Sequence, residues 1–289
     1  MLLTLLALTT VPTAPTVRDI PVATGEVIRT TSVGEGPPVV LVPGMVGSAY
    51  VFRKVIPTLE ANGLRVVVIE PLGVGWSSRP ADADYSLTAQ ARRIAAVMDS
   101  LGIREATVMG HSLSVSIVLR LALLRPDLVG GIVADNGGPE ERAATSGVRK
   151  AAKYSFLIKL FGGKSRLKKE LEKGLRGTAG DSTWITPEVL DTYSAPAAQN
   201  LGATLDVLKG MARAEDDSLA PRLGRIMVPV HLLVGGAPHG SGIKTSHSVL
   251  LRQRLPHFVV DTIPGAGLHL HEERPDAVAG AILAMAGRC

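Results

Sequence analysis

The sequence feature that most constrains the fold is residues 105–125, which read EATVMGHSLSVSIVLRLALLR. The stretch opens with a short apolar run at residues 106–109, long enough for a buried strand and bounded by Gly110. It closes with residues 115–124, which are apolar almost all round and so predict a helix buried against a sheet. Only the residues GHSLS separate the two elements, so the middle residue is forced into a tight, strained turn.

Ser112 is the middle residue of this turn. Its hydroxyl is expected at the C-terminal edge of the sheet, in front of a helix N-terminus whose backbone N–H groups favour a developing negative charge. This is the geometry of a nucleophile elbow, whose pattern G-x-S-x-G is kept here except for Ser114 in place of the last glycine. Serine is small enough to preserve close packing of helix and strand. The alternative interpretation is a tight turn with a capping serine.

Composition limits the classes of protein that this chain can represent. A length of 289 residues, 46% of them hydrophobic, suits one large α/β domain with an insertion, or two modest domains. Aromatic residues make up 3%, and they do not alternate with basic residues as in a nucleic-acid platform. The single cysteine, Cys289, excludes an intrachain disulfide and a cysteine metal cluster. We expect no metal and no organic cofactor, because no metal ligands cluster in the sequence.

The first eight residues, MLLTLLAL, are apolar but lack the preceding Lys or Arg of a secretory signal. The run is also too short to span a bilayer. We expect residues 1–16 to form a disordered or weakly docked tail of a cytoplasmic protein. A signal remnant and export are the alternative.

Strand and helix signals alternate along the rest of the chain. Residues 20–33 predict an antiparallel pair around a turn at residues 23–25, and further strands are predicted at 39–42, 65–69, 106–109, 130–134, 228–234 and 258–262. One helix is predicted at 49–62, and a second begins at the N-cap Ser86 and stops at Gly102. This alternation predicts a doubly wound, mostly parallel α/β sheet.

Four blocks of the chain, in order, are LVPGMVGS, EPLGVGWSSRP, VMGHSLS and IPGAGLHLHEERPD. Together they resemble the α/β-hydrolases of the small-molecule serine esterase, haloperoxidase-like and dehalogenase-like group, over about residues 20–288. The resemblance implies an α/β-hydrolase core at residues 17–136 and 226–289. The intervening residues 137–225 interrupt the strand–helix alternation and predict an inserted helical cap.

The predicted cap carries two apolar stripes and many basic residues. The stripes are Tyr154, Leu157, Ile158 and Phe161, and Leu167, Leu171 and Leu175; the basic residues are Arg149, Lys150, Lys153, Lys159, Lys164, Arg166, Lys168, Lys169, Lys173 and Arg176. We expect the basic residues to form a solvated face of the cap helices. The alternatives are weak contact with an anionic membrane surface and attraction of acidic substrates. Trp184 is a candidate residue at the substrate entrance.

The resemblance also implies roles for individual residues. Ser112 is the expected nucleophile, and the backbone N–H groups of Met45 and Leu113 are the expected oxyanion hole. Pro43 stands where relatives usually have a histidine. Dehalogenases of this group need a carboxylate at the position of Ser112, so halide displacement is not expected.

The acid of the expected triad is displaced from its usual position. That position is Pro238, and no Asp or Glu lies in the loop 235–242. A second acid position, used by some relatives, falls on Asn136, with Asp135 one residue early. Adjacent strand residues point to opposite faces, so we expect only one of the two to meet the base. Asp135 is the provisional orienting group and Asn136 its substitute; a purely structural Asp135 is the alternative.

The base is displaced in the same way. The motif register places Leu268 where relatives carry the catalytic histidine, with His269 immediately after it and His271 at a common non-catalytic position. A loop path shifted by one residue would present His269 to Ser112. The alternative is a broken triad in which His269 is a surface histidine.

These features predict a serine-dependent hydrolase that cleaves small, largely apolar carboxylic esters through an acyl-enzyme. In this hypothesis Ser112 is the nucleophile, His269 the base and Asp135 the orienting group. The expected partner is a small-molecule ester and not a nucleic acid. A non-catalytic ligand-binding descendant and a carbon–carbon bond hydrolase are the alternatives, and the natural ester and the oligomeric state stay open.

Overall fold

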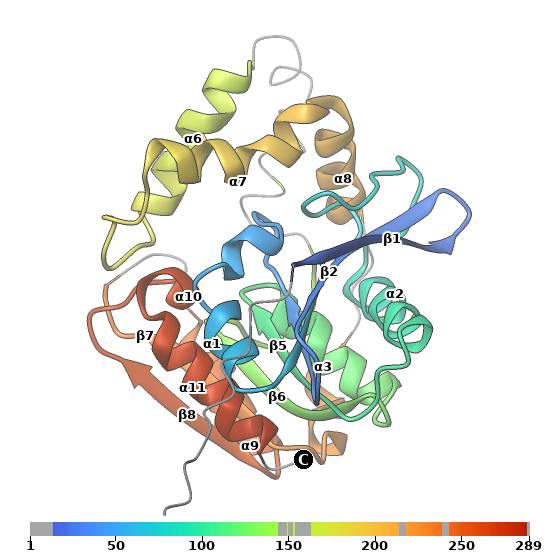
Figure 1. Cartoon of the computed structure of the whole chain (residues 1–289), viewed down its shortest axis with the longest axis vertical. Helices are drawn as coiled ribbons and strands as arrows, with labels where there is room; N and C mark the ends of the chain where they lie inside the picture. Colours follow the sequence, from blue (N-terminus) through green and yellow to red (C-terminus); the bar gives the residue numbers. More distant parts are fainter. Residues whose placement is uncertain are drawn as a thin grey trace, which may run out of the picture.

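The fold is taken from a computed structural model that describes residues 14–143, 149, 153, 163–213, 218–238 and 243–287. Eight strands form one sheet in the order β1-β2-β4-β3-β5-β6-β7-β8 (Figure 1). The strands are β1 (Thr16–Ala23), β2 (Glu26–Val33), β3 (Pro38–Val42), β4 (Arg65–Ile69), β5 (Ala106–His111), β6 (Val129–Asp135), β7 (Val230–Gly235) and β8 (Phe258–Ile263). β2 pairs antiparallel with both of its neighbours, β1 and β4. All the other neighbouring pairs, β4-β3, β3-β5, β5-β6, β6-β7 and β7-β8, are parallel. The predicted doubly wound, mostly parallel sheet is therefore confirmed.

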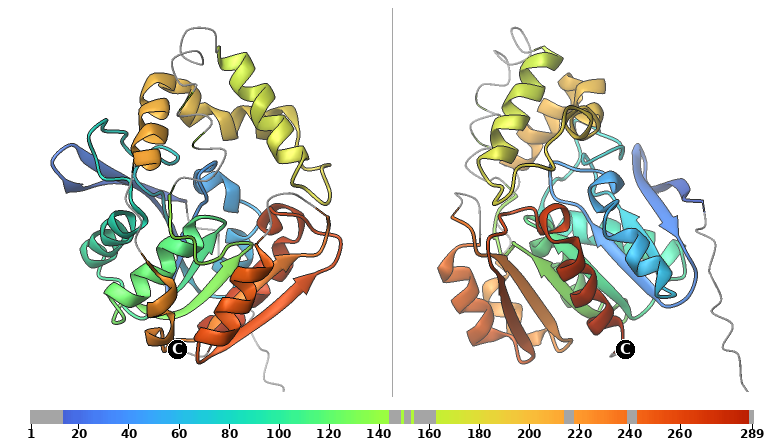
Figure 2. Two further views of the ribbon diagram at one scale, coloured as in Figure 1. Left: turned by 180° about the vertical axis from the view of Figure 1, so that it is seen from behind. Right: turned by 60° about the vertical axis from the view of Figure 1, so that its left-hand side comes forward.

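Helices cover both faces of the sheet (Figure 2). The helical elements described are η1 (Ala49–Phe52), α1 (Ile56–Ala61), α2 (Leu87–Ser100), α3 (Ser114–Leu124), α6 (Lys164–Arg176), α7 (Pro187–Gln199), α8 (Leu201–Arg213), η2 (Ala220–Arg225), α9 (Thr245–Arg254), α10 (Leu270–Glu273) and α11 (Pro275–Ala286). Val40 of β3 packs in one apolar cluster with α2 and α3, and its neighbour Leu41 packs in a second cluster with α1 and α11. Successive side chains of a strand point to opposite faces of the sheet, so the fully buried residues of β3 contribute alternately to two apolar cores.

Local signals in the sequence mark several element ends correctly. The Ser86 hydroxyl accepts a hydrogen bond from the backbone N–H of Ala89 at 3.2 Å, so Ser86 is the N-cap of α2 as predicted. The helix predicted at 49–62 is instead a 3₁₀ turn, η1, followed by the short α1. Pro57 explains the break, because a proline lacks an N–H and is tolerated only in the first turn of a helix. Helix α10, between β8 and α11, is a further difference, because the sequence analysis predicts no helix there.

Helices α6, α7 and α8 follow β6 in the chain and gather above the sheet in Figure 1. Of the two predicted stripes, Leu167, Leu171 and Leu175 lie on α6, where Leu175 is buried and the other two are half-buried. The stripe formed by Tyr154, Leu157, Ile158 and Phe161 lies outside the described residues. The division into core and cap at residues 136 and 226 stays a prediction.

The predicted N-terminal tail is described only from residue 14, and Thr16 already belongs to β1. Among the described residues, no helix combines the length and the apolar character that a membrane span requires.

Candidate active site

The turn between β5 and α3 has the strained backbone that the sequence predicts. Ser112 has φ = 54°, in the left-handed region that residues other than glycine seldom adopt. Its backbone N–H donates to the carbonyl oxygen of Asp135 at 2.8 Å, and its own carbonyl accepts from the N–H of Val115 at 3.1 Å. These two bonds hold Ser112 between β6 and the first turn of α3. Among the described residues, the Ser112 hydroxyl makes no hydrogen bond.

Two small residues make this turn compatible with close packing of strand and helix. A Cβ atom at Gly110 would lie 2.8 Å from the backbone of Ser114, so any larger residue would force α3 away from β5. Ser114, which replaces the last glycine of the elbow pattern, donates its hydroxyl to the carbonyl of Pro43 at 2.6 Å. The serine at the last position of the pattern therefore bonds the elbow to the loop after β3.

That loop carries one of the predicted oxyanion-hole donors. Met45 follows Gly44, and a Cβ at Gly44 would lie 2.9 Å from Cδ2 of the His111 ring. Within the part of the chain that the structure describes, neither the N–H of Met45 nor that of Leu113 makes a hydrogen bond. Both donors are therefore available to a ligand, as an oxyanion hole requires. Their assignment to an oxyanion hole stays a prediction.

The end of β6 provides a fully buried carboxylate. Asp135 is 0% exposed, and its Oδ2 lies 3.0 Å from Nδ1 of His111 and 3.0 Å from Nδ1 of His271. Burial acts to raise the pKa of Asp135, but the neighbouring imidazoles, His111 first, hold that pKa below its usual value. An ionised carboxylate only accepts hydrogen bonds. Both rings must then donate from Nδ1–H.

His271 lies deepest of the site histidines, with 1% of its surface exposed. Burial lowers its pKa, and the charge of the nearby His111 lowers it further, against the opposing effects of Asp135 and Glu272. His271 is therefore expected to be neutral at pH 7. Its ring packs edge-on against Phe52 at a centroid distance of 5.5 Å.

His269 occupies a different part of the site. It immediately precedes α10, and its Nε2 lies 3.2 Å from Oγ1 of Thr178. The Thr178 hydroxyl also lies within donating distance of the carbonyl of Gly174, at 3.0 Å, and we infer that it accepts from Nε2–H of His269. The lone pair of His269 is then on Nδ1.

The ring of His269 lies between the elbow and the inserted helices, at centroid distances of 5.5 Å from His111 and 5.4 Å from Trp184. With 7% of its surface exposed, His269 is not the surface histidine of the broken-triad alternative.

Asn136 has a structural position beside Asp135. Its Nδ2 donates to the carbonyls of Gly267 and Leu268, each at 3.1 Å, and its Oδ1 accepts from the N–H of Gly235 at 2.9 Å. Its Nδ2 also lies 3.3 Å from Oδ1 of Asp135. Asp135 thus contacts His111 and His271, whereas Asn136 contacts backbone and Asp135, and the expectation that one of the two meets the base His269 stays a prediction. Both side chains reach the same loop because Asn136 leaves the strand with φ = 46°.

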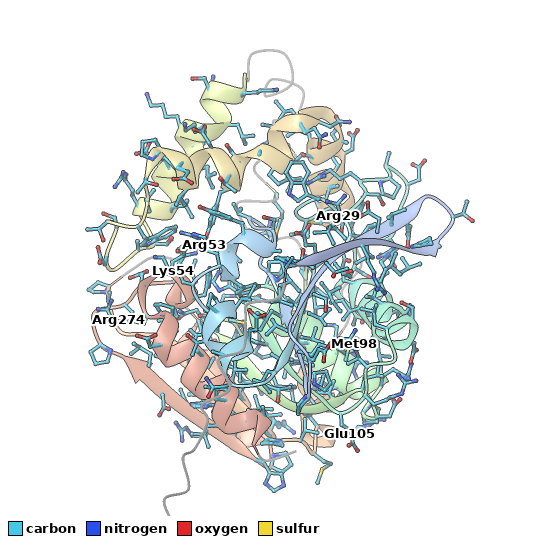
Figure 3. The ribbon with its side chains drawn as sticks, in the orientation of Figure 1. Arg29, Arg53, Lys54, Met98, Glu105 and Arg274 are labelled. Carbon is cyan, nitrogen blue, oxygen red and sulfur yellow. The ribbon has the colours of Figure 1, made fainter. Side chains whose placement is uncertain are left out.

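Leu268 is buried, with 8% of its surface exposed, and its backbone N–H donates to the carbonyl of Thr178 at 2.8 Å. Two acidic residues of α10 fix the rest of this loop. Glu273 Oε2 accepts from the N–H groups of Gly180, Asp181 and Gly267, each at 2.9 Å. Glu272 is ion-paired with Arg53 and Lys54, which are labelled in Figure 3, and accepts from the Tyr193 hydroxyl at 2.7 Å. The histidine-bearing loop is thus bonded to both the core and the inserted helices.

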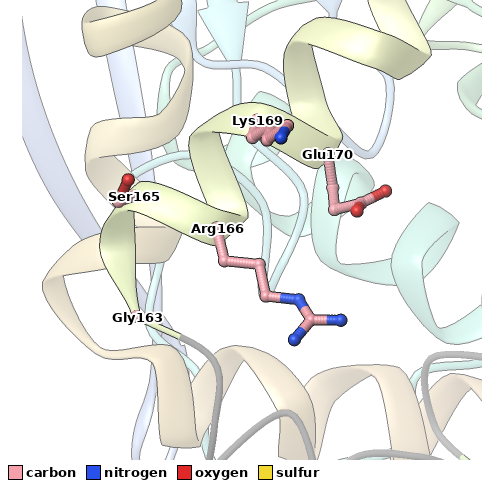
Figure 4. A pocket seen from close by; sticks show the side chains of 5 residues that line it. All are labelled: Gly163, Ser165, Arg166, Lys169 and Glu170. Atoms are coloured by element: carbon pink, nitrogen blue, oxygen red, sulfur yellow. The ribbon is translucent and has the colours of Figure 1, made fainter.

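A separate surface hollow lies at the start of α6 (Figure 4). Its lining residues are Gly163, Ser165, Arg166, Lys169 and Glu170. None of them belongs to the elbow, the loop after β3 or the imidazole cluster, so the hollow is distinct from the candidate active site. The expected solvated basic face, and its alternatives of weak contact with an anionic membrane surface and attraction of acidic substrates, stay predictions.

Residues 37–157 match the protein-family model described as the α/β hydrolase fold. The structure also superposes on a meta-cleavage product hydrolase from Pseudomonas fluorescens with a TM-score of 0.75, over 93% of this chain and 96% of that chain, at 20% identity. The chain therefore has the α/β-hydrolase fold. At this identity, the structural likeness establishes the fold alone.

The chain covers very different shares of two curated relatives. The chain is 34% identical to the putative carbamate hydrolase RutD of Stutzerimonas stutzeri over 102 residues, which are 35% of this chain and only 38% of that protein. It is 29% identical to the magnesium-chelatase 30 kDa subunit of Rhodobacter capsulatus over 267 residues, which are 88% of each. The activity of this chain is therefore a matter for proposal.

Sequence reasoning missed two residues of the site. His111 immediately precedes Ser112 in the elbow pentapeptide, and its place at the end of a strand next to β6 was the signal that could have linked it with Asp135. Thr178 offered no such signal, because its contact with His269 spans 91 positions and depends on how the segment after α6 packs.

The neutral, buried His271 makes the free energy of unfolding of this protein sensitive to acid. A histidine in the unfolded chain has a pKa of about 6.5, whereas the pKa of His271 in the folded protein is lower. Below about pH 6.5 the unfolded state therefore binds more protons, and the free energy of unfolding falls by up to about 1.4 kcal/mol per pH unit. The contribution is fully present above that pH. His271→Asn, which keeps a donor towards Asp135, should flatten this slope.

The measurement is urea denaturation between about pH 5 and pH 8 in buffer with EDTA, for wild type, His271→Asn and the control His231→Asn. His231 lies at the sheet edge beside Asp261 and outside the site. Equal slopes for all three proteins would show that His271 is not the titrating group.

Proposed function

We propose that this α/β-hydrolase is a serine-dependent enzyme that cleaves small, largely apolar carboxylic esters through an acyl-enzyme. The observation that carries the proposal is the strained Ser112, at φ = 54°, between β5 and α3. Its hydroxyl and the N–H groups of Met45 and Leu113 make no hydrogen bonds among the described residues. A nucleophile with two unused backbone donors nearby suits attack on a carbonyl carbon.

In the proposed mechanism His269 is the general base. Its Nδ1 carries the lone pair, because Nε2–H donates to Thr178. His269 takes the proton of Ser112 as the hydroxyl oxygen attacks the ester carbon, and the two backbone donors stabilise the oxyanion. The resulting imidazolium then protonates the leaving alcohol. A water, deprotonated by the same ring, hydrolyses the acyl-enzyme.

The role of Asp135 in this mechanism differs from that of a triad acid in direct contact with the base. Its Oδ2 accepts from His111 and His271, and the His111 ring lies 5.5 Å, centroid to centroid, from His269. Asp135 would therefore stabilise the imidazolium through its field and through the packing of the two rings. Because Asp135 does not bond to the base directly, we expect a slower enzyme than one with an intact triad.

The surroundings of His269 support a small, largely apolar substrate. Trp184 and Leu268 are buried beside it and present apolar surface. The indole Nε1–H of Trp184 has no acceptor among the described residues, so it is available to a single polar atom of a ligand. The names of relatives, which include a putative carbamate hydrolase, an epoxide hydrolase and a haloalkane dehalogenase, support hydrolysis as the reaction class. Serine at position 112 favours acyl transfer over halide displacement.

The assignment of the nucleophile predicts a burst of p-nitrophenol from p-nitrophenyl butyrate, approaching one equivalent per chain. A fluorophosphonate probe should label the same protein, and mass spectrometry should place the label on Ser112. Ser112→Ala should abolish labelling and lower turnover by about 10³-fold or more. Ser100→Ala, an exposed serine at the end of α2, is the matched control and should behave as wild type. Labelling that survives Ser112→Ala would refute the assignment, and absence of any burst would favour the non-catalytic alternative.

The assignment of the base predicts that His269→Ala lowers the rate of acyl-enzyme formation by about 10³-fold, because the proposed mechanism transfers the proton of Ser112 to this ring. Leu268→His, which restores the family residue at that position, should add little, because the Leu268 backbone is held by Thr178 and Asn136. Stopped-flow measurement of the burst rate tests both variants, with His231→Ala as control. A wild-type burst rate in His269→Ala, or a large gain in Leu268→His, would show that His269 is not the base.

A further inference from the structure

Helix α6 lies at the outer end of the inserted helices, away from the sheet (Figure 1, Figure 2), and carries most of the net charge of the protein. Its 13 residues, KSRLKKELEKGLR, include six of the 31 basic residues and two of the 26 acidic residues of the chain. The helix therefore has a net charge of +4, against +5 for the whole chain. A typical protein surface intersperses both signs of charge, so this concentration points to an anionic partner.

The two faces of α6 differ in chemistry. The leucine face packs on the protein: Leu175 is buried, and Leu171 packs against the apolar cluster that contains Trp184. The opposite face of the helix, here called the outer face, carries four exposed basic residues spaced by three or four positions, which are Arg166, Lys169, Lys173 and Arg176. At about 1.5 Å of rise per residue, these four cations form one row about 15 Å long.

Neighbouring acids neutralise little of the outer face. Among the described residues, Arg166, Lys169 and Lys173 form no ion pair. Arg176 pairs with Glu172 at 2.9 Å, but the two side chains are 46% and 39% exposed, so water screens the pair. The row of cations therefore acts on its surroundings as an extended positive charge.

The form of the outer face favours a flat anionic surface over the other acidic partners. Proteins that bind single-stranded nucleic acid add aromatic side chains for stacking, and α6 contains none. A small acidic substrate would be attracted by cations that face the candidate active site, whereas this row lies opposite the leucine face. A row of Lys and Arg gains affinity for anionic lipids from their negative surface potential, without a shaped pocket.

We propose that Arg166, Lys169, Lys173 and Arg176 dock the protein reversibly on an anionic membrane surface, with α6 lying parallel to that surface. The contact is electrostatic, because Leu171 and Leu175 pack on the protein and do not enter the bilayer. Binding should therefore require negatively charged lipid and should weaken as salt screens the charges.

Docking has a consequence for the proposed reaction, and this consequence alone rests on the proposed function. Thr178, two residues after Arg176, contacts the ring of His269 and accepts from the backbone N–H of Leu268. A protein docked through α6 would therefore hold the candidate active site close to the membrane, where largely apolar esters accumulate. Hydrolysis of membrane-dissolved esters should then be faster on anionic than on neutral membranes.

The test is flotation of the full chain, free of any histidine tag, with lipid vesicles. One set of vesicles contains phosphatidylcholine alone, and the other contains equal parts of phosphatidylcholine and phosphatidylglycerol. The protein should bind the anionic vesicles at low ionic strength and should not bind the neutral ones. Addition of about 0.5 M NaCl should weaken this binding by at least about tenfold.

Substitutions then locate the docking surface. The triple variant Arg166→Gln, Lys169→Gln, Lys173→Gln should bind about 100-fold more weakly, because each basic residue near an anionic surface contributes about fivefold to the affinity. Glu170→Gln removes a negative charge beside Arg166 and Lys169, with which it lines the hollow in Figure 4. It should therefore strengthen binding, by up to about fivefold.

The matched control is the triple variant Arg18→Gln, Arg92→Gln, Arg254→Gln. It also removes three positive charges, but from exposed positions on β1, α2 and α9. Its affinity for the anionic vesicles should stay within about threefold of wild type, because charges farther than a Debye length from the lipid are screened. Circular dichroism checks that each variant is folded.

The consequence for the reaction is tested with p-nitrophenyl octanoate dissolved in the same two sets of vesicles. Its hydrolysis should be faster in the anionic vesicles, and the triple variant of the outer face should lose this difference. Hydrolysis of p-nitrophenyl butyrate in vesicle-free buffer should be the same for the triple variant and wild type.

The docking surface would be overturned if the protein did not bind anionic vesicles at low ionic strength, or if it bound neutral vesicles equally well. Equal losses in the outer-face variant and its matched control would overturn it too, as would binding to polyglutamate or duplex DNA without binding to the vesicles. Vesicle binding as predicted in a protein without ester turnover would leave the docking surface standing and overturn only the proposed function. Equal octanoate hydrolysis in both sets of vesicles would overturn the consequence for the reaction.

Discussion

The interaction on which the site depends is the pair of hydrogen bonds that Asp135 accepts from His111 and His271. A carboxylate with no solvent exposure loses its hydration and is stable only if donors replace the water. Here the two imidazoles supply those donors, each at 3.0 Å, and the pKa of Asp135 stays low. Because the three residues come from β5, β6 and α10, the same bonds fix the end of the sheet to the last loop.

The second constraint is that the inserted helices are bonded directly to the loop that carries His269 and His271. Thr178, just after α6, accepts from the ring of His269 and, through its carbonyl, from the N–H of Leu268. Glu273 accepts from three backbone N–H groups on both sides of this contact. The position of α6 and the tautomer of His269 are therefore coupled. A shift of the inserted helices would break the contact between Thr178 and the ring of His269.

Most of the fold could be predicted from the sequence, because buried parallel strands appear as short apolar runs bounded by glycine and proline. The elbow could be predicted for a related reason: a buried strand and a buried helix separated by so few residues leave Ser112 one backbone path, and φ = 54° confirms it. The site was harder to predict. Register alone singled out Leu268 and Asn136, but the backbone of one and the side chain of the other are used to hold the loop. The short helix α10, which gives His271 its position beside Asp135, has no signal of its own in so polar a segment.

The protonation pattern of the three imidazoles is the central claim, because it decides which nitrogen of His269 can act as the proposed general base. Long-range ¹H–¹⁵N correlation spectra of the ¹⁵N-histidine-labelled protein near pH 7 report the tautomer of each ring directly, with assignment by His→Asn or His→Gln variants. We predict that His111 and His271 carry their proton on Nδ1 and that His269 carries its proton on Nε2. Spectra in which His271 is doubly protonated, or in which His111 or His271 carries its proton on Nε2, would contradict the account.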